Sequence, residues 1–114
     1  SFYCLQNEIW QSDKEYFNTD KIKDFGKYDL VEISSIIKNL DLVISVDTAI
    51  LHISAILNKE TWGIFNIYPD WRWGALDKIN PYNSLVKINQ TKFNQWEDVT
   101  NEIYERLKKK FKLN

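Results

Sequence analysis

The sequence predicts an α/β fold in which a mostly parallel sheet is flanked by helices. Short apolar segments rich in β-branched residues alternate with segments of helical periodicity along the 114 residues. The segment 42–46 is apolar on both faces, as is typical of a central parallel strand that helices cover on two sides. Strands that alternate with helices are joined by right-handed crossovers, which place them parallel in one sheet. We therefore expect one domain over residues 1–114.

The first forty residues predict two short strands and a helix. Phe2–Leu5 is expected to form a short buried strand and Ile22–Phe25 a second strand, whereas residues 6–20 carry no clear pattern. Asp29 can cap a helix, and Glu32, three residues on, can reach back to it in a capping box. Apolar residues then recur at helical spacing and form one stripe: Leu30, Ile33, Ile36, Ile37 and Leu40.

The rest of the chain predicts further strands and two helices. Thr48–Leu57 is apolar nearly all round and should form a largely buried helix, which Asn58 can end in the left-handed conformation. Two strands are expected on either side of a long connection, 66–83, and they are Thr61–Phe65 and Leu85–Ile88. Asn94–Glu97 repeats the capping pattern and should open a last helix. The apolar stripe of that helix comprises Trp96, Val99, Ile103, Leu107 and Phe111.

Composition and charge exclude several classes of partner and site. Lys and Arg number 15 and Asp and Glu 16, so we expect neither nucleic acid nor an anionic membrane as a partner. The longest apolar runs are too short for membrane insertion. The single cysteine, Cys4, excludes an internal disulfide and a cysteine-based zinc site, which favours a cytoplasmic location. The chain has no methionine and enters an apolar segment almost at once, so we expect it to be a piece of a longer protein.

The strongest candidate site is the turn between the strand that ends near Val46 and the following helix. Ligands bind beyond the carboxyl ends of parallel strands, and the unpaired N–H groups of a first helical turn suit a phosphate or pyrophosphate. Thr48 can add a hydroxyl, and the small Ala49 lets a ligand approach the backbone. His52 lies one turn later on the same face and can donate to a phosphate oxygen. Asp47 is expected to orient a neighbour or to meet a sugar hydroxyl.

Each of these residues also fits a purely structural role. Asp47 or Thr48 can simply cap the helix, and a lone histidine on an apolar helix is often a core residue whose hydrogen bonds are satisfied. His52 has no metal-ligating partners at a suitable spacing, so neither a metal site nor a cofactor is expected. The sequence contains no GxGxxG segment, no Walker loop and no recognisable setting for a nucleophile.

A second candidate site lies in the long connection. Trp71 and Trp73 flank Arg72, and together they offer a stacking surface for a base or a sugar and a guanidinium that binds anions. The structural alternative is a loop that its aromatic residues pin to the core. Connections of this length in a compact domain are usually functional or disordered.

Several of these segments together resemble a known family. They are similar to the C-terminal part of bacterial heptosyltransferase-like glycosyltransferases, which have two domains in the GT-B arrangement. The subgroup associated with tetratricopeptide repeats is the most similar, and its second C-domain strand ends in Leu-Gln, as Phe2–Gln6 does here. The similarity runs over most of the chain and is carried by Asp41–Ala49, His52, Trp62 and Asp70–Trp73.

The resemblance implies a Rossmann-like domain that binds a nucleotide-diphosphate sugar, the donor. Phosphate contacts would fall to Thr48, the backbone of Ala49 and His52. Asp47 would be an orienting contact, and Gln6 would line the nucleotide pocket. The family's first C-domain strand is missing here, as is its N-terminal domain, which carries the acceptor site and the general base. We therefore expect a sheet that is incomplete at its N-terminal side, and an isolated chain without activity. The possible substrate loop would comprise Trp71, Arg72 and Trp73.

The chain departs from the family pattern after Trp73. An arginine-rich stretch with a Ser-Pro-Trp-Tyr-Pro-like sequence is replaced by 78–83, and Gly-Lys-Pro after the buried helix is replaced by Asn58–Glu60. This departure favours an alternative of another class, a non-catalytic interaction or assembly module that kept the glycosyltransferase scaffold. A receiver-like signalling domain with Asp47 as phosphoacceptor is excluded, because Leu5-Gln6 stands where an acidic pair is needed.

Overall fold

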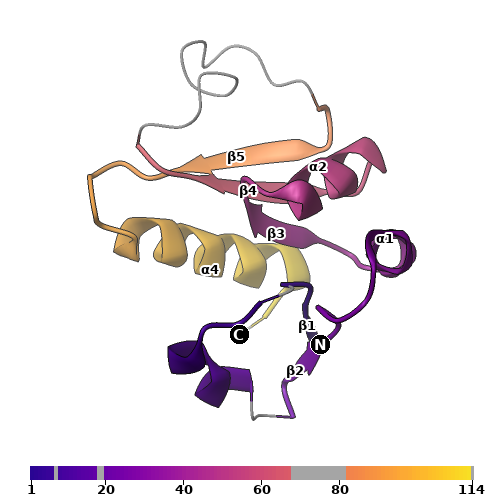
Figure 1. The fold of residues 1–114 in the computed structure, drawn as a ribbon. Coiled ribbons are helices and arrows are strands. Elements are labelled where there is room, and N and C mark those ends of the chain that lie inside the picture. Colours follow the sequence, from indigo (N-terminus) through magenta and orange to yellow (C-terminus); the bar gives the residue numbers. More distant parts are fainter. Residues whose placement is uncertain (7, 18–19, 68–81, 114) are drawn as a thin grey trace. The chain divides into compact units, whose positions relative to one another are not determined.

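The computed structural model of the chain describes residues 1–6, 8–17, 20–67 and 82–113. They divide into two compact units, Ser1–Leu40 and Asp41–Asn114 (Figure 1). All strand ladders among the described residues are parallel, in two sheets flanked by helices, which confirms the predicted α/β class. The organisation as one domain stays a prediction. In the described part of the chain, no helix is both long and apolar enough to cross a membrane.

The first unit contains a two-stranded sheet. Strand β1 (Phe2–Cys4) pairs in parallel with β2 (Ile22–Asp24), so both predicted strands are confirmed. A short 3₁₀ helix, η1 (Gln11–Phe17), lies between them, where the sequence predicted no element. The predicted burial of β1 is wrong, because Phe2 is 60% exposed and Tyr3 37% exposed. In the described chain β1 has one neighbouring strand, which leaves much of its surface in contact with water.

Helix α1 (Leu30–Lys38) begins at the predicted capping box. Asp29 Oδ1 accepts a hydrogen bond from the backbone N–H of Glu32 at 2.8 Å, and Glu32 Oε2 accepts one from the N–H of Asp29 at 3.0 Å. These reciprocal bonds satisfy N–H groups at the start of the helix. The apolar stripe is confirmed in part, since Ile33 and Ile37 are buried, Ile36 and Leu40 are half-buried, and Leu30 is exposed.

The second unit is built on a three-stranded parallel sheet. Its strands are β3 (Val43–Val46), β4 (Thr61–Phe65) and β5 (Leu85–Asn89), in the order β3-β4-β5. The predicted positions of all three are confirmed to within a residue or so. The prediction of a covered, central strand at 42–46 is wrong, because β3 lies at an edge of the sheet and Val46 is 52% exposed. The central strand is β4, which is buried along most of its length.

Two helices cover opposite faces of this sheet, α2 (Ala49–Ile56) and α4 (Glu97–Phe111) (Figure 1). Successive strand residues point to opposite faces, so the two clusters of core residues lie on different sides of the sheet. Helix α2 is less buried than predicted, because it packs on the sheet with one side only and Ile56 is 68% exposed. Asn58 ends it at φ 56°, in the left-handed conformation that the sequence predicted. The clusters comprise Leu51, Phe65 and Leu85 on the α2 side, and Trp62, Ile88 and Val99 on the α4 side.

The start of α4 differs from the prediction. The N-cap residue is Trp96, without a capping side chain, and Asn94 lies before it at φ 55°. The buried side chain of Gln90 fixes this turn, since its Nε2 donates to the carbonyl of Gln95 at 3.2 Å and its Oε1 accepts from the N–H of Ile67 at 3.2 Å. A contact from outside the helix therefore overrides the local capping pattern. In the predicted stripe Val99 is buried, Ile103 and Leu107 are half-buried, and Trp96 and Phe111 are exposed.

An ion pair joins α4 to the start of β4. Lys110 Nζ donates to Glu60 Oε2 at 2.6 Å, and the indole N–H of Trp62 donates to Glu60 Oε1 at 3.1 Å. The hydrogen bond from Lys110 holds the pKa of Glu60 below its ordinary value of 4.5, although partial burial of the carboxyl opposes this shift.

We expect Glu60→Gln to lower the free energy of unfolding at neutral pH by less than about 1 kcal/mol, because the side chains of Lys110 and Glu60 are 32% and 41% exposed and solvent screens the pair. A lowered carboxyl pKa stabilises the fold above the ordinary pKa, and this contribution is lost as the pH falls through the folded-state value. The difference between wild type and variant should therefore shrink below about pH 4.5. Urea unfolding at pH 7 and at about pH 3.5 measures it. An equal difference at both pH values would contradict the expectation.

Candidate functional site

The turn between β3 and α2 brings together four of the predicted site residues. Asp47, Thr48 and Ala49 follow the carboxyl end of β3, and His52 lies one turn into α2. Thr48 occupies the N-cap position in an extended conformation, with φ −139° and ψ 174°, but its side chain makes no capping hydrogen bond. Its Oγ1 lies 3.1 Å from Ser45 Oγ, which itself donates to the carbonyl of Val46 at 2.9 Å. Thr48 therefore occupies the position of a capping residue, as the structural alternative expected, but its side chain does not make the capping hydrogen bond.

The start of α2 is suited to an anion. Backbone N–H groups in the first turn of an α-helix have no intrahelical acceptor, and here the side chain of Thr48 supplies none. Their partial positive charges form the positive end of the helix dipole. Both Thr48 and Ala49 are exposed, so a ligand can approach the backbone at this point. Phosphate binding at this turn stays a prediction.

His52 is held at both ring nitrogens. Its Nε2 lies 3.2 Å from Asp47 Oδ1, and its Nδ1 lies 3.0 Å from the hydroxyl of Tyr82. The side chains of His52 and Asp47 are 33% and 31% exposed. His52 is therefore neither a fully buried core residue nor a freely moving surface one. Its Nε2 faces Asp47, the residue immediately before the N-cap of α2.

Tyr82 is a site residue that sequence reasoning missed. Its ring packs against the core cluster of Leu51, Phe65 and Leu85, and meets the His52 ring edge-on at 5.9 Å between centroids. Tyr82 follows His52 by 30 residues and lies near the end of the long connection. Neither helical spacing nor a strand pattern links two such positions, so the sequence carried no signal for this contact.

The remaining predicted site residues fall elsewhere. Gln6 lies in the first unit just after β1, is exposed, and donates from its amide to the carbonyl of Glu8 at 2.6 Å. Its part in a nucleotide pocket stays a prediction. The predicted substrate loop lies outside the described residues, and its members are Trp71, Arg72 and Trp73.

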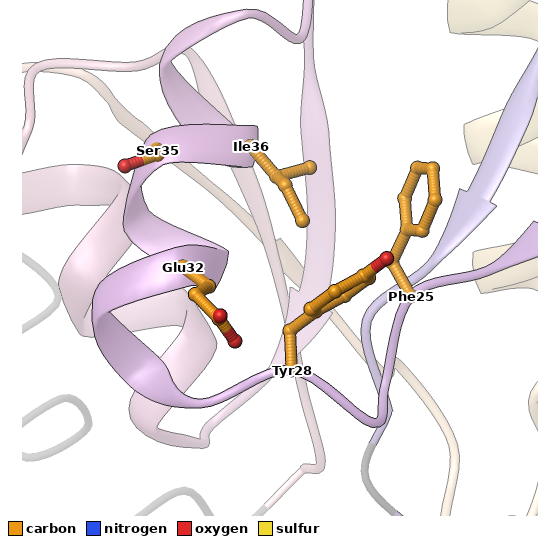
Figure 2. A pocket seen from close by; sticks show the side chains of 5 residues that line it. All are labelled: Phe25, Tyr28, Glu32, Ser35 and Ile36. Carbon is orange, nitrogen blue, oxygen red and sulfur yellow. The ribbon is translucent and has the colours of Figure 1, made fainter.

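The first unit has a hollow of about 410 Å³ that the sequence did not indicate (Figure 2). The rings of Phe25 and Tyr28 form part of its lining, 5.8 Å apart between centroids and tilted by 56°. Helix α1 contributes Glu32, Ser35 and Ile36. The carboxylate of Glu32 is engaged in the capping box, and the hydroxyl of Ser35 faces the carbonyl of Val31 at 3.4 Å. The hollow thus offers aromatic surface, but its polar groups already have partners within α1 and its cap.

The β3–α2 turn presents backbone N–H groups, the hydroxyl of Thr48 and the imidazole of His52 as polar groups. The described residues contain no group of three histidine, cysteine, aspartate or glutamate side chains placed to hold a metal ion. Asp47 and His52 are paired with each other at the start of the helix. The orienting role expected of Asp47 stays a prediction.

Comparison with known protein families assigns most of the chain. The family model of glycosyltransferase family 9 (heptosyltransferase) matches residues 6–109. No curated protein and no solved structure matches the chain significantly. The matched range covers most of each unit and includes the β3–α2 turn and Tyr82.

Proposed function

The chain belongs to glycosyltransferase family 9 (heptosyltransferase), and on this premise we propose that it binds the nucleotide-diphosphate sugar donor of a glycosyltransferase. The observation that carries the proposal is the β3–α2 turn, where the start of α2 lacks a capping side chain and His52 is turned toward it. Negative charge is favoured at such a helix start. The donor's diphosphate is the anionic group that a transferase of this kind must hold.

In the proposed complex, the diphosphate lies over the first turn of α2. The exposed backbone at Ala49 and the hydroxyl of Thr48 supply hydrogen-bond donors to its oxygens. His52 supplies a third donor through Nε2, which faces this turn. Asp47 holds the imidazole in place and accepts from a sugar hydroxyl when the donor binds.

The proposed reaction transfers the sugar to an acceptor hydroxyl. The acceptor oxygen forms a bond to the anomeric carbon while the bond from that carbon to the phosphate oxygen breaks. The nucleoside diphosphate leaves with the electron pair of the broken bond, and the acceptor proton passes to a general base. Donors aimed at the leaving diphosphate stabilise the charge that develops there. In this proposal the chain supplies the hydrogen-bond donors to the diphosphate, and the general base belongs to another domain of the longer protein.

We further propose that the chain is the Rossmann-like C-terminal half of a two-domain GT-B enzyme, from the subgroup associated with tetratricopeptide repeats. The segments Asp41–Ala49 and Asp70–Trp73 support this assignment by their resemblance to that subgroup. Its partners would be the donor and the N-terminal domain, which brings the acceptor. The isolated chain would then bind the donor without turning it over.

The proposal is tested by recording backbone amide NMR spectra while UDP-, GDP-, ADP- and CMP-sugars are added in turn. We expect shifts at Thr48–His52 for one nucleotide and little change with the others. If a well-folded chain responds to none of them, the titration is repeated on a longer form of the protein. A lack of response there as well would overturn the proposal and favour a non-catalytic interaction module.

We expect His52→Phe to weaken binding of the responding nucleotide roughly tenfold, because a hydrogen bond to a charged group is lost. Phenylalanine keeps a flat aromatic ring, but it also leaves the Asp47 carboxylate without its bond to the imidazole beside the phosphates. Isothermal titration calorimetry measures the affinity. Ile56→Ala, at the exposed far end of α2, serves as the control and should bind as wild type does. Equal affinities of His52→Phe and wild type would contradict a role for the imidazole.

A further inference from the structure

We propose that Tyr82 is a positioning residue that holds His52 as an Nε2–H donor directed at the β3–α2 turn; this inference rests on the proposed donor site. The observation behind it is a chain of three side chains in the second unit. Tyr82 contacts His52 Nδ1 at 3.0 Å, and Asp47 contacts His52 Nε2 at 3.2 Å. Both nitrogens of the imidazole are thus within hydrogen-bond distance of a partner.

The hydrogen-bond pattern selects one tautomer of the ring. An ionised carboxylate only accepts hydrogen bonds, so the proton between His52 and Asp47 belongs to Nε2. A neutral imidazole has one N–H, which leaves Nδ1 as an acceptor. The Tyr82 hydroxyl can therefore donate to Nδ1 while Nε2–H points to Asp47. For a neutral ring beside an ionised carboxylate, this is the one arrangement of protons that makes both hydrogen bonds.

Tyr82 is well placed to hold this orientation because its own ring is anchored. It packs against the core residues Leu51, Phe65 and Leu85 and meets the His52 ring edge-on, with 72° between the ring planes. Helix α2 alone allows the imidazole to turn about its last side-chain bond, which would exchange the nitrogen that faces the turn for a carbon. The hydroxyl of Tyr82 opposes that rotation, since the rotated ring would lose its bond to Nδ1.

The Nε2–H group of His52 is therefore oriented toward the diphosphate site before the ligand arrives. A phosphate oxygen at the start of α2 can replace Asp47 as the acceptor of the Nε2–H hydrogen bond, or accept it together with Asp47. Neither change requires the ring to rotate. Groups that are held in their bound orientation lose less conformational freedom on binding. Tyr82 would act in this way through His52, without touching the ligand itself.

The orientation can be tested on the free protein, because His52 is the only histidine in the chain. Long-range proton–nitrogen NMR at about pH 8.5, where an ordinary histidine is neutral, should show hydrogen on Nε2 and an unprotonated Nδ1 that accepts a hydrogen bond. In Tyr82→Phe, which keeps the ring, the Nδ1 resonance should shift away from its wild-type position, because the hydrogen bond from Tyr82 is lost. Tyr104→Phe, on the exposed side of α4, is the matched control and should leave both nitrogens unchanged. A protonated Nδ1 in the wild type, or an identical Nδ1 resonance in Tyr82→Phe, would overturn the proposal.

The second measurement is the affinity for inorganic pyrophosphate by calorimetry. Tyr82→Phe loses the neutral hydrogen bond to His52 Nδ1 and should bind pyrophosphate about 2- to 10-fold more weakly. Tyr104→Phe should bind as wild type does. Equal affinities of Tyr82→Phe and wild type would overturn the role in ligand binding. If neither the chain nor the longer form of the protein binds pyrophosphate or any nucleotide, the donor site is refuted, and the ring-nitrogen spectra still decide whether Tyr82 orients His52.

Discussion

Replacing Leu51 by alanine is expected to lower the free energy of unfolding by about 2–5 kcal/mol. Leu51 is fully buried and packs in the cluster that joins α2 to the sheet, together with Phe65 and Leu85. The truncated side chain would leave a cavity between a helix and two strands that cannot close without moving one of them. Urea unfolding followed by circular dichroism measures the change.

The control for Leu51→Ala lies on the same helix. Ile56 is 68% exposed, so Ile56→Ala should change the free energy of unfolding by about 0.5 kcal/mol or less. Similar losses for both variants would mean that α2 does not pack as described. Because Tyr82 rests on the Leu51 cluster, Leu51→Ala should also loosen the contact between Tyr82 and His52, visible in the His52 ring-nitrogen spectrum.

Replacing Gly26 by alanine is expected to destabilise the first unit by about 3 kcal/mol, at the upper end of the usual cost of overpacking. A Cβ on Gly26 would lie 1.9 Å from the carbonyl oxygen of Gln6 and 2.7 Å from its carbonyl carbon. Both are backbone atoms, so no rotation of a side chain can relieve the clash. The chain after β1 must move, which also disturbs the hydrogen bond that the N–H of Gly26 donates to Asp24 at 2.9 Å.

Amide hydrogen exchange localises this effect, since faster exchange should appear in β1 and β2 and not in β4. The neighbouring Lys27→Ala, at an exposed position, is the control and should leave exchange in both strands unchanged. Gly63→Ala offers a second comparison, because its Cβ would meet side-chain atoms of Phe65 and Leu51 at 2.8 and 2.9 Å. Unchanged exchange in the first unit of Gly26→Ala would show that the backbone at Gln6 is not held as closely as described.

Features that depend on neighbouring residues in the sequence were predicted well. The capping box of Asp29 and Glu32 and the left-handed Asn58 were both expected from local chemistry and both are confirmed. The strands were also located correctly, because β-branched apolar runs between turn residues identify a strand whatever its neighbours are.

Features that depend on distant residues were predicted poorly. An apolar strand has the same sequence at the centre of a sheet and at its edge, so the pattern of 42–46 did not show that β3 pairs with β4 alone in the described chain. The capping pattern at Asn94 was overridden by Gln90, and the contact between His52 and Tyr82 spans 30 residues. At the candidate site, the sequence thus indicated the turn and the histidine, but not what holds the histidine.

The buried amide of Gln90 has a consequence for which substitutions its position can accept. One planar group accepts from the N–H of Ile67 and donates to the carbonyl of Gln95, so it fastens two separate stretches of backbone at once. A leucine or methionine would fill the same space but leave both backbone groups unmatched, and a glutamate would place an acceptor against the carbonyl of Gln95. The exit of β4 and the entry to α4 are therefore aligned by complementary polarity, which no side chain of similar shape can reproduce.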